Sequence, residues 1–292
     1  MISSSLVRRS KHPEPTLDPE AQCPPVGPPL FHVDAFTDRP FAGNPAAVCV
    51  LSAERDDAWL QKVASEMNLA ETAYLWSGEP HWRLRWFTPT VEVDLCGHAT
   101  LASAHVLWEA GYARPGTTLL FETRSGRLTA SQRDGGKTIE LDFPAEPAVE
   151  SSPPADLLAA LGLTAHRFAG RNRLDYLIEV ETERAVRALA PDFRRLATAC
   201  GPTRGVIVTA ASDRPQHDFV SRFFAPGAGI DEDPVTGSAH CCLGPFWAGR
   251  LGRKELRGYQ ASPRGGTVAV RVAGGRVHLG GQAVTVMRGE LL

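Results

Sequence analysis

The chain has 292 residues, of which 43% are hydrophobic and 22% are charged, and its formal net charge is −2. This composition is ordinary for a soluble globular protein, and the length is sufficient for two hydrophobic cores. No basic block interleaved with aromatic residues occurs, and no apolar run has transmembrane length. We therefore expect a protein that binds neither nucleic acid nor a membrane.

The chain has six cysteines at irregular spacing and no C-x-x-C pair. Such a pattern is typical of reduced thiols in a cytoplasmic protein rather than of a disulfide framework. Residues 1–30 are rich in Ser, Pro and charge and lack the apolar core of a secretory signal. We interpret them as a disordered leader outside the fold.

The first half of the chain predicts strands that flank two helices. Segments 31–37, 46–51, 71–76 and 81–87 have the composition and turn signals of strands. Apolar residues at helical spacing predict a helix that starts near Asp56 and ends at Asn68. A second helix, 97–110, carries almost no charge, so we expect it to be buried on most faces. Antiparallel strands are predicted at 119–122, 126–131 and 137–143.

The second half predicts a similar series. The proline-rich segment 144–154 is interpreted as a linker. Helices are expected at 155–161, near 183–188 and, again almost without charge, at 237–248. Strands are expected near 175–180, 205–210, 219–224, 267–272, 276–280 and 282–288.

A motif occurs once in each half. Arg85-Trp86-Phe87 and Arg222-Phe223-Phe224 are each followed by a proline, an acidic residue (Asp94 and Asp233) and a small-residue turn that opens an uncharged helix. The repeat predicts an α+β fold of two pseudo-symmetric domains, each a curled, mostly antiparallel sheet around a central apolar helix. We assign 31–143 to the first domain and 144–279 to the second, with 280–292 as a candidate to complete the first.

The helices of the two domains begin at Gly97 and Gly237. Helix N-termini carry unpaired N–H groups and partial positive charge, and therefore bind anions. If the two helix starts face one cleft, the protein clamps a small carboxylate between its domains.

Three residues could move a proton at such a site. Glu71 at a strand start is either an ordinary solvated carboxylate or a buried one whose raised pKa suits acid–base catalysis. His98, in the first helical turn, either bonds the backbone or polarises a substrate oxygen. Asp233 is either a helix cap or a group that orients His98 or the substrate, and Ser238 is either an ordinary first-turn serine or part of an anion-binding turn.

Cys96 suggests a rival mechanism. A thiol just before a helix N-terminus has a lowered pKa, and one thiolate from each domain would make a two-base racemase or epimerase. The matching position in the second half is Thr236, so the second thiol is missing. A small buried filler is the alternative role for Cys96.

The sequence lacks the signals of the common cofactors. It contains no zinc-binding spacing, no G-x-G-x-x-G after a strand, no phosphate-binding loop and no G-x-S-x-G elbow. We therefore expect neither a metal nor an organic cofactor.

From about Phe31 to its end, the chain resembles the PhzF-like family of phenazine-biosynthesis proteins. The resemblance is carried by the segments 34–37, 41–48, 68–72, 97–102 and 232–240. It implies the fold of diaminopimelate epimerase, with the active site between two pseudo-symmetric domains. By resemblance, Glu71 is the catalytic acid/base, His98, Asp233 and Ser238 are further active-site residues, and the backbone of Gly97 and Gly237 approaches the substrate.

The resemblance also implies a cofactor-independent isomerase and a homodimer. The phenazine enzyme moves a proton on a cyclohexadiene 2-amino-3-hydroxy acid, but many members of the family lie outside phenazine pathways. Here Ala70 replaces the serine that precedes the catalytic glutamate in the phenazine enzyme. The sequence thus predicts proton transfer by one glutamate on a small carboxylic acid, with a cysteine-dependent racemase and a non-catalytic binding protein as alternatives.

Overall fold

The computed structural model describes residues 27–78 and 80–292. Most of the predicted leader, 1–30, lies outside these residues. Its last two residues, Pro29 and Leu30, belong to the first strand instead, and Leu30 is buried in a hydrophobic cluster.

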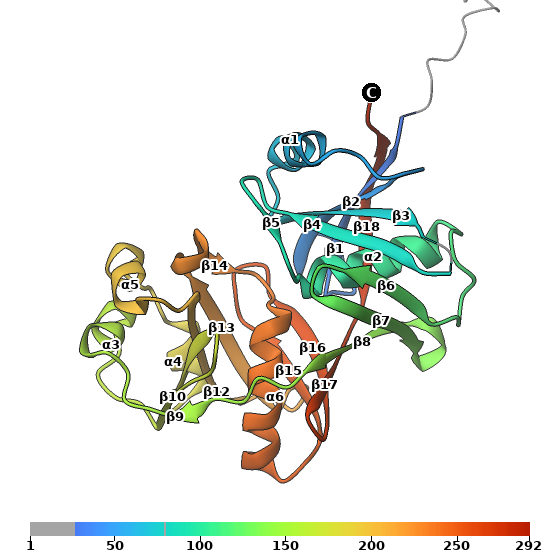
Figure 1. The fold of residues 1–292 in the computed structure, drawn as a ribbon. Helices are drawn as coiled ribbons and strands as arrows, with labels where there is room; N and C mark the ends of the chain where they lie inside the picture. The colour runs from blue at the N-terminus through green and yellow to red at the C-terminus, as the bar shows by residue number, and fades with distance from the viewer. Residues whose placement is uncertain (1–26, 79) are drawn as a thin grey trace, which may run out of the picture.

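The first half is a curled sheet around one helix, in the upper part of Figure 1. Its strands are β1 (Pro29–Ala35), β2 (Asn44–Val50), β3 (Glu71–Ser77), β4 (Trp82–Phe87), β5 (Glu92–Val93), β6 (Leu119–Thr123), β7 (Gly126–Arg133) and β8 (Thr138–Pro144). They surround α2 (Gly97–Glu109), while α1 (Asp57–Met67) packs on the outer face of the sheet. Two of the strand pairs, β2–β3 and β4–β6, are parallel, and the other pairs within this half are antiparallel.

The second half repeats this arrangement around α6 (Gly237–Leu251). Its strands are β9 (Val149–Glu150), β10 (Phe168–Arg171), β11 (Asp175–Glu179), β12 (Gly205–Ala211), β13 (Phe219–Ala225), β14 (Ile230–Asp233), β15 (Glu255–Gln260), β16 (Gly266–Ala273) and β17 (Arg276–Gly281). The short helices α3 (Ala155–Leu161), α4 (Glu183–Arg187) and α5 (Phe193–Cys200) cover its outer face.

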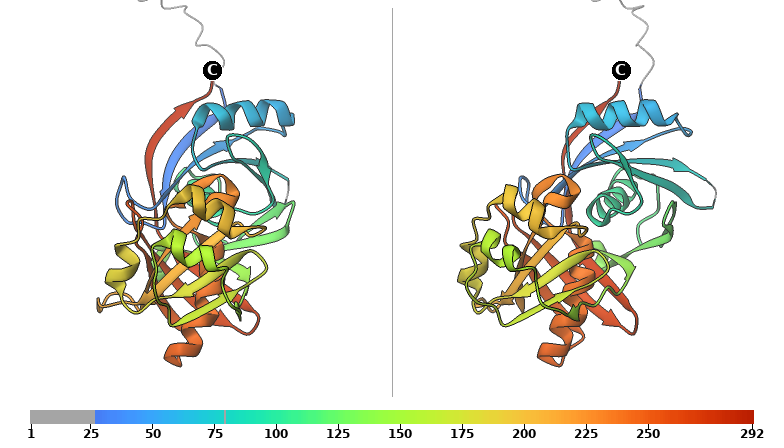
Figure 2. Two further views of the ribbon diagram at one scale, coloured as in Figure 1. Left: turned by 90° about the vertical axis from the view of Figure 1, so that its left-hand side faces the viewer. Right: turned by 60° about the vertical axis from the view of Figure 1, so that its left-hand side comes forward.

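The two halves are joined by their strands. β8 of the first half pairs antiparallel with β17 of the second, and β18 (Ala283–Glu290) returns to pair antiparallel with β1. All strands therefore form one continuous sheet, which curls around both helices without closing (Figure 2). A single hydrophobic core contains residues of both α2 and α6.

The predicted burial of the two central helices is confirmed. Ten of the 13 residues of α2 are buried, as are eight of the 15 residues of α6. α6 runs three residues past the predicted end, because Gly252 supplies the left-handed cap at φ 65°. β1 ends two residues early, because Phe36 takes a positive φ of 61° that a strand cannot continue.

Several short elements were missed from the sequence. β10, α5 and β15 had no predicted counterpart, and the predicted linker 144–154 contains the end of β8 and the strand β9. α5 buries only Leu196 and Cys200, and β9 pairs with β10 over two residues. Such elements depend on tertiary packing more than on their own periodicity.

The repeated motif forms the same ion pair twice. Arg85 holds Glu92 through two hydrogen bonds of 2.7 Å, and Arg222 holds Glu232 through bonds of 2.7 and 2.8 Å. The matching acidic residues are therefore the two glutamates, and the predicted match of Asp94 with Asp233 is wrong. The second loop, 225–231, has three more residues than the first, 88–91, which shifts the spacing.

Among the described residues, none of the helices combines the length and the apolar character needed to cross a membrane.

Candidate active site

The starts of the two central helices meet at a pair of glycines. A Cβ atom added to Gly97 would lie 3.3 Å from the Cα of Gly237, and a Cβ on Gly237 would lie equally close to Gly97. This spacing is tighter than ordinary packing, so the two backbones approach because neither residue has a side chain. The two helix starts therefore meet, while the cleft predicted between them stays a prediction.

These two helices, like α3, begin without a side-chain cap, unlike the other three helices. α1, α4 and α5 are capped by the side chains of Asp56, Thr182 and Asp192, each of which accepts a backbone N–H bond. The cap positions of α2 and α6 are Cys96 and Thr236, and neither side chain makes a capping bond. The first N–H groups of both helices thus lack the side-chain oxygen that usually satisfies them, which favours an anion there.

Glu71, Cys96 and His98 lie together at the start of α2. Glu71 Oε2 is 3.2 Å from His98 Nε2, and the Cys96 Sγ is 3.5 Å from His98 Nδ1. His98 and Cys96 are each only 5% exposed, whereas the Glu71 side chain is 20% exposed. Glu71 is therefore the member of this group that an entering molecule would meet.

Asn44 links His98 to the second half of the molecule. Its Nδ2 atom lies 3.1 Å from His98 Nδ1, and it donates to Asp233 Oδ1 at 2.8 Å and to the carbonyl of Val235 at 2.9 Å. Both hydrogens of the Asn44 amide are taken by Asp233 and Val235, and the Cys96 thiol lies within reach of both ring nitrogens of His98, at 3.5 and 4.0 Å. Asn44 therefore joins the start of α2 to Asp233 and the start of α6.

Asp233 is fixed on both oxygens. Besides the Asn44 bond to Oδ1, the hydroxyl of Thr236 donates to Oδ2 at 2.5 Å. Gln260 in turn donates to Thr236 Oγ1 at 3.1 Å and to the Asp233 carbonyl at 2.7 Å. Asp233 contacts His98 through Asn44 rather than directly, and its bound carboxylate suits an orienting role more than a proton-transfer role.

Burial shifts the pKa values of this group in different directions. Burial, together with the negative charge of Asp233, raises the pKa of Glu71 to about 8, against a smaller lowering by the Cys96 thiol. Burial lowers the pKa of His98 to about 3 and raises that of Asp233 to about 6, where bonds from Thr236 and Asn44 oppose it. At neutral pH the contact between Glu71 and His98 is therefore not an ion pair, since the imidazole is neutral.

Burial and the nearby Glu71 raise the pKa of Cys96 well above its usual value. The helix N-terminus was expected to lower it, but desolvation of the thiolate is the stronger effect here. All five cysteines within the described residues are buried and free, in accord with the expected reduced thiols.

A second charged group lies at the start of α6. Arg204 Nη2 is 3.0 Å from Ser238 Oγ and 2.6 Å from Asp175 Oδ2, and Arg204 Nε is 3.2 Å from Asp175 Oδ1. Asp175 is 1% exposed, and the Arg204 side chain is 37% exposed. The predicted residue Ser238 thus lies beside a guanidinium that no sequence motif indicates.

Glu71, Cys96 and His98 also form a group whose donor atoms lie within 4.8 Å of one another, as a metal site requires. A thiol binds a metal as the thiolate, and the raised pKa of Cys96 opposes that ionisation. The group therefore fits proton transfer better than metal ligation.

The structure brings Glu71 to His98, and Gly97 to Gly237, and connects His98 to Asp233 through Asn44. Asn44 and Arg204 are the residues that sequence reasoning missed. Asn44 Oδ1 and Glu71 Oε2 are buried without a hydrogen-bonding partner among the described residues. The contact of Glu71 with His98 does not count as a partner, because it lacks hydrogen-bond geometry. Buried oxygens without donors mark a place where a ligand or a proton completes the network.

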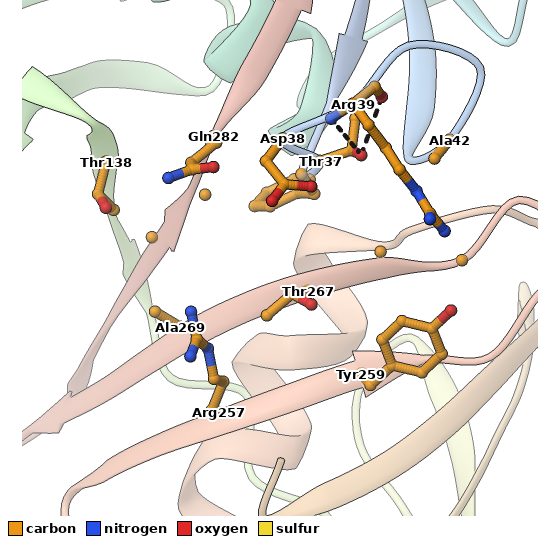
Figure 3. A pocket seen from close by; sticks show the side chains of 15 residues that line it. Thr37, Asp38, Arg39, Ala42, Thr138, Arg257, Tyr259, Thr267, Ala269 and Gln282 are labelled. Carbon is orange, nitrogen blue, oxygen red and sulfur yellow. Dashed lines mark hydrogen bonds between the residues drawn. The ribbon is translucent and has the colours of Figure 1, made fainter. Parts of the chain in front are cut away.

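A separate pocket of about 250 Å³ lies between the loop after β1 and strands β15 to β17. Figure 3 shows Asp38 and Arg39 of that loop above β16, with Arg257 and Tyr259 of β15 below it. None of Glu71, His98 and Asp233 lines this pocket, so it is distinct from the site at the helix starts.

Comparison with known proteins identifies the relatives of this chain. The family model PhzC-PhzF, described as phenazine biosynthesis-like protein, matches residues 33–289. An uncharacterized isomerase of Halalkalibacterium halodurans is 54% identical over 265 residues, which cover 90% of this chain and 98% of the relative. The crystal structure of a PhzF family phenazine biosynthesis protein from Enterococcus faecalis has a TM-score of 0.86 at 42% identity, covering 91% of this chain and 99% of that one.

A probable proline racemase from Agrobacterium radiobacter has a TM-score of 0.59 at 13% identity, covering 91% of this chain and 93% of that one, which shows likeness of fold alone. The predicted epimerase-like α+β fold is confirmed by these neighbours. From the extent of the family match and of the identity, the chain belongs to the PhzC-PhzF family of phenazine biosynthesis-like proteins, with relatives that are named isomerases.

Proposed function

We propose that this protein is a cofactor-independent isomerase that moves a proton on a small carboxylic acid bound between the starts of α2 and α6. Glu71 is the acid/base group of this reaction. The observation that carries the proposal is the buried, partly accessible Glu71 carboxyl with a pKa near 8, beside the neutral His98. A carboxyl tuned to this range can both take a proton from carbon and return it.

The substrate carboxylate would lie against the uncapped N–H groups of both helices. Ionised Glu71 removes a proton from a carbon of the acid, and the electron pair left on that carbon moves into the conjugated carboxyl or double bond. Protonated Glu71 then delivers the same proton to another carbon, so the double bond shifts and no atom is gained or lost. His98 Nε2 lies 3.2 Å from Glu71 Oε2, and a ring proton on that nitrogen would stabilise the carboxylate when it is charged.

The rival role for Cys96 needs a thiolate and a second base in the other half. The raised pKa of the thiol and the presence of Thr236 at the matching position both oppose it. Asp233 is the acidic group nearest to that position, and both of its oxygens are already bonded. The arrangement therefore supports one-base transfer by Glu71.

Hydrogen exchange from heavy water tests the proposal without knowledge of the product. The protein is incubated in deuterated buffer with a panel of small unsaturated and saturated 2-amino and 2-hydroxy acids, and C–H signals are followed by proton NMR. Enzyme-dependent loss of a C–H signal in at least one acid is expected. A complete lack of exchange across the panel would instead favour a binding protein that has lost catalysis.

A further inference from the structure

The two halves place different residues at equivalent positions. In the first half, Glu71 of β3 is paired with Ala46 of the parallel strand β2. The next residue of β3, Thr72, is paired with Phe87 of the antiparallel strand β4. In the second half, Gly205 of β12 is paired with Asp175 of the parallel strand β11. The next residue of β12, Val206, is paired with Phe224 of the antiparallel strand β13. Because Phe87 and Phe224 close the repeated motif, Gly205 stands where the first half has its glutamate.

No side chain can occupy position 205. A Cβ atom there would lie 2.0 Å from the carbonyl oxygen of Phe224 and 2.8 Å from the Cα of Ala225. Both contacts are with backbone, which cannot move aside easily. The second half therefore has no room for an acid/base residue at this position.

The residue before Gly205 is charged. Arg204 occupies the position of Ala70, and its guanidinium reaches Ser238 in the first turn of α6. Two bonds to the buried Asp175 fix its orientation, and the Phe223 ring lies 5.8 Å from its central carbon. These bonds use Nε and Nη2, so Nη1 stays unbonded within the described part of the chain. Arg204 also lowers the pKa of Asp233, so its field reaches the centre of the site.

Independent features between the helix starts also indicate a missing ligand. Asn44 is fully buried, yet its Oδ1 atom has no donor within the residues that the structure describes, and the same holds for Glu71 Oε2. Unsatisfied oxygens of this kind are unusual in a folded protein. A substrate with a hydroxyl or amino group next to its carboxylate would bring donors to this region while its carboxylate meets a cation.

We propose that Arg204 binds the carboxylate of the substrate at the start of α6, held in place by Asp175 and Ser238. The first half then transfers the proton and the second half holds the anion. This inference rests on the proposed function and deepens it, since it selects acids that carry a free carboxylate over their esters and amides. A planar guanidinium held by one carboxylate can still offer N–H groups to another.

Calorimetric binding to three variants tests this assignment. Arg204→Gln removes the charge, Arg204→Lys keeps it without the planar fork, and Arg250→Gln is a matched control. Arg250 also pairs with a buried carboxylate, Glu179 at 2.8 Å, but it lies at the far end of α6, ~18 Å from Ser238 by helix rise. The probes are the 2-amino and 2-hydroxy acids of the heavy-water panel and the primary amide of each.

We expect at least one acid to bind the wild-type protein about 10- to 100-fold more tightly than its amide, as a charged hydrogen bond implies. Arg204→Gln should remove this preference, Arg204→Lys should keep part of it, and Arg250→Gln should keep all of it. Unchanged acid preference in Arg204→Gln, or no binding of any acid to the wild-type protein, would overturn the assignment. Circular dichroism of each variant checks the fold, and Arg204→Lys decides the matter if Arg204→Gln does not fold.

The binding experiment and the heavy-water exchange experiment test the two proposals separately. If acids exchange in heavy water but Arg204→Gln binds them normally, the role of Arg204 is wrong and the isomerase proposal stands. If acids bind through Arg204 and never exchange, the binding role stands and the isomerase proposal is wrong.

Discussion

The two halves of this molecule share one scaffold but differ in the residues at their helix starts. The first half presents Glu71, Cys96 and His98, and the second presents Gly205, Thr236 and Ser238 at the corresponding places. Each half keeps the uncapped helix start and the arginine–glutamate pair that supports the preceding hairpin. The repeat preserves the uncapped helix start in both halves, but it places a glutamate at the strand position before it only in the first half, where the second has Gly205.

This asymmetry bears on the type of reaction. Inverting a carbon centre with two bases requires a proton-transfer group on each face of the substrate. Glu71, whose pKa burial raises to about 8, belongs to the first half. In the second half Asp233 has a pKa of about 6, but both of its oxygens are bonded, to Asn44 and to Thr236. A repeat with chemistry on one side is suited to moving a proton between two carbons on the same face of a substrate.

The largest expected effect comes from removing the base of the first half. Glu71→Gln should lower turnover by about 10²- to 10⁴-fold while ligand binding is kept, because one positioned acid/base contributes about that much. Turnover is measured by hydrogen exchange and binding by calorimetry. Glu92→Gln is the matched control, since it removes a carboxylate of the same half that pairs with Arg85 and Arg124 and not with His98. If Glu71→Gln turns over at the wild-type rate, Glu71 is not the acid/base group, and the difference between the halves does not explain the reaction.

A smaller effect is expected at the link between the halves. Asn44→Ala removes the donor that serves Asp233 and the Val235 carbonyl, and leaves two buried acceptors without partners. Each such loss costs about 1–3 kcal/mol of unfolding free energy, so a clear shift in the urea midpoint should follow. His98 also loses a neighbour 3.1 Å from its Nδ1 atom, and turnover should fall. A variant as stable and as active as the wild-type protein would show that Asn44 does not join the halves.

The smallest effect is expected at the thiol. Cys96→Ser should change turnover by less than about tenfold, well below the hundredfold that marks an acid/base group. The reason is the raised pKa of Cys96, which keeps the thiol protonated and unreactive. Hydrogen exchange in the variant measures the effect. A loss as large as that of Glu71→Gln would revive the two-base mechanism.

The sequence predicted the repeat and most of the frame of the site. The uncharged stretches that became α2 and α6 are long and apolar on all faces, so composition alone predicted two buried helices. The glycines at their starts came from the repeated motif. The role of Glu71 came from the family resemblance, because the position of a glutamate in a strand does not tell whether it is buried.

Asn44 and Arg204 could not be selected in this way. Asn44 follows a glycine and precedes a proline, which is the composition of a turn, and its partners His98 and Asp233 lie 54 and 189 residues away. Arg204 precedes a strand without any motif, and only the alignment of Gly205 with Glu71 would have drawn attention to it. That alignment was hidden because the connection from β12 to β13 is three residues longer than the one from β3 to β4. The longer loop 225–231 separately led to the wrong match of Asp94 with Asp233.

The pH dependence of the reaction follows from the raised pKa of Glu71. The ionised form is the one that removes a proton from carbon, and burial shifts its appearance to a pKa of about 8. Below that value the ionised fraction falls about tenfold for each pH unit, so the rate at limiting substrate should rise with pH up to about 8 and then level off. An ordinary glutamate would instead give a flat profile across the neutral range.

A direct NMR titration of the Glu71 carboxyl carbon tests the central claim more closely than any rate. The signal is assigned as the one that disappears in Glu71→Gln, and it is followed in the free protein labelled with ¹³C. A midpoint near 8 is expected if burial and Asp233 tune this group for proton transfer. A midpoint near 4.5, the value of a freely solvated glutamate, would contradict it.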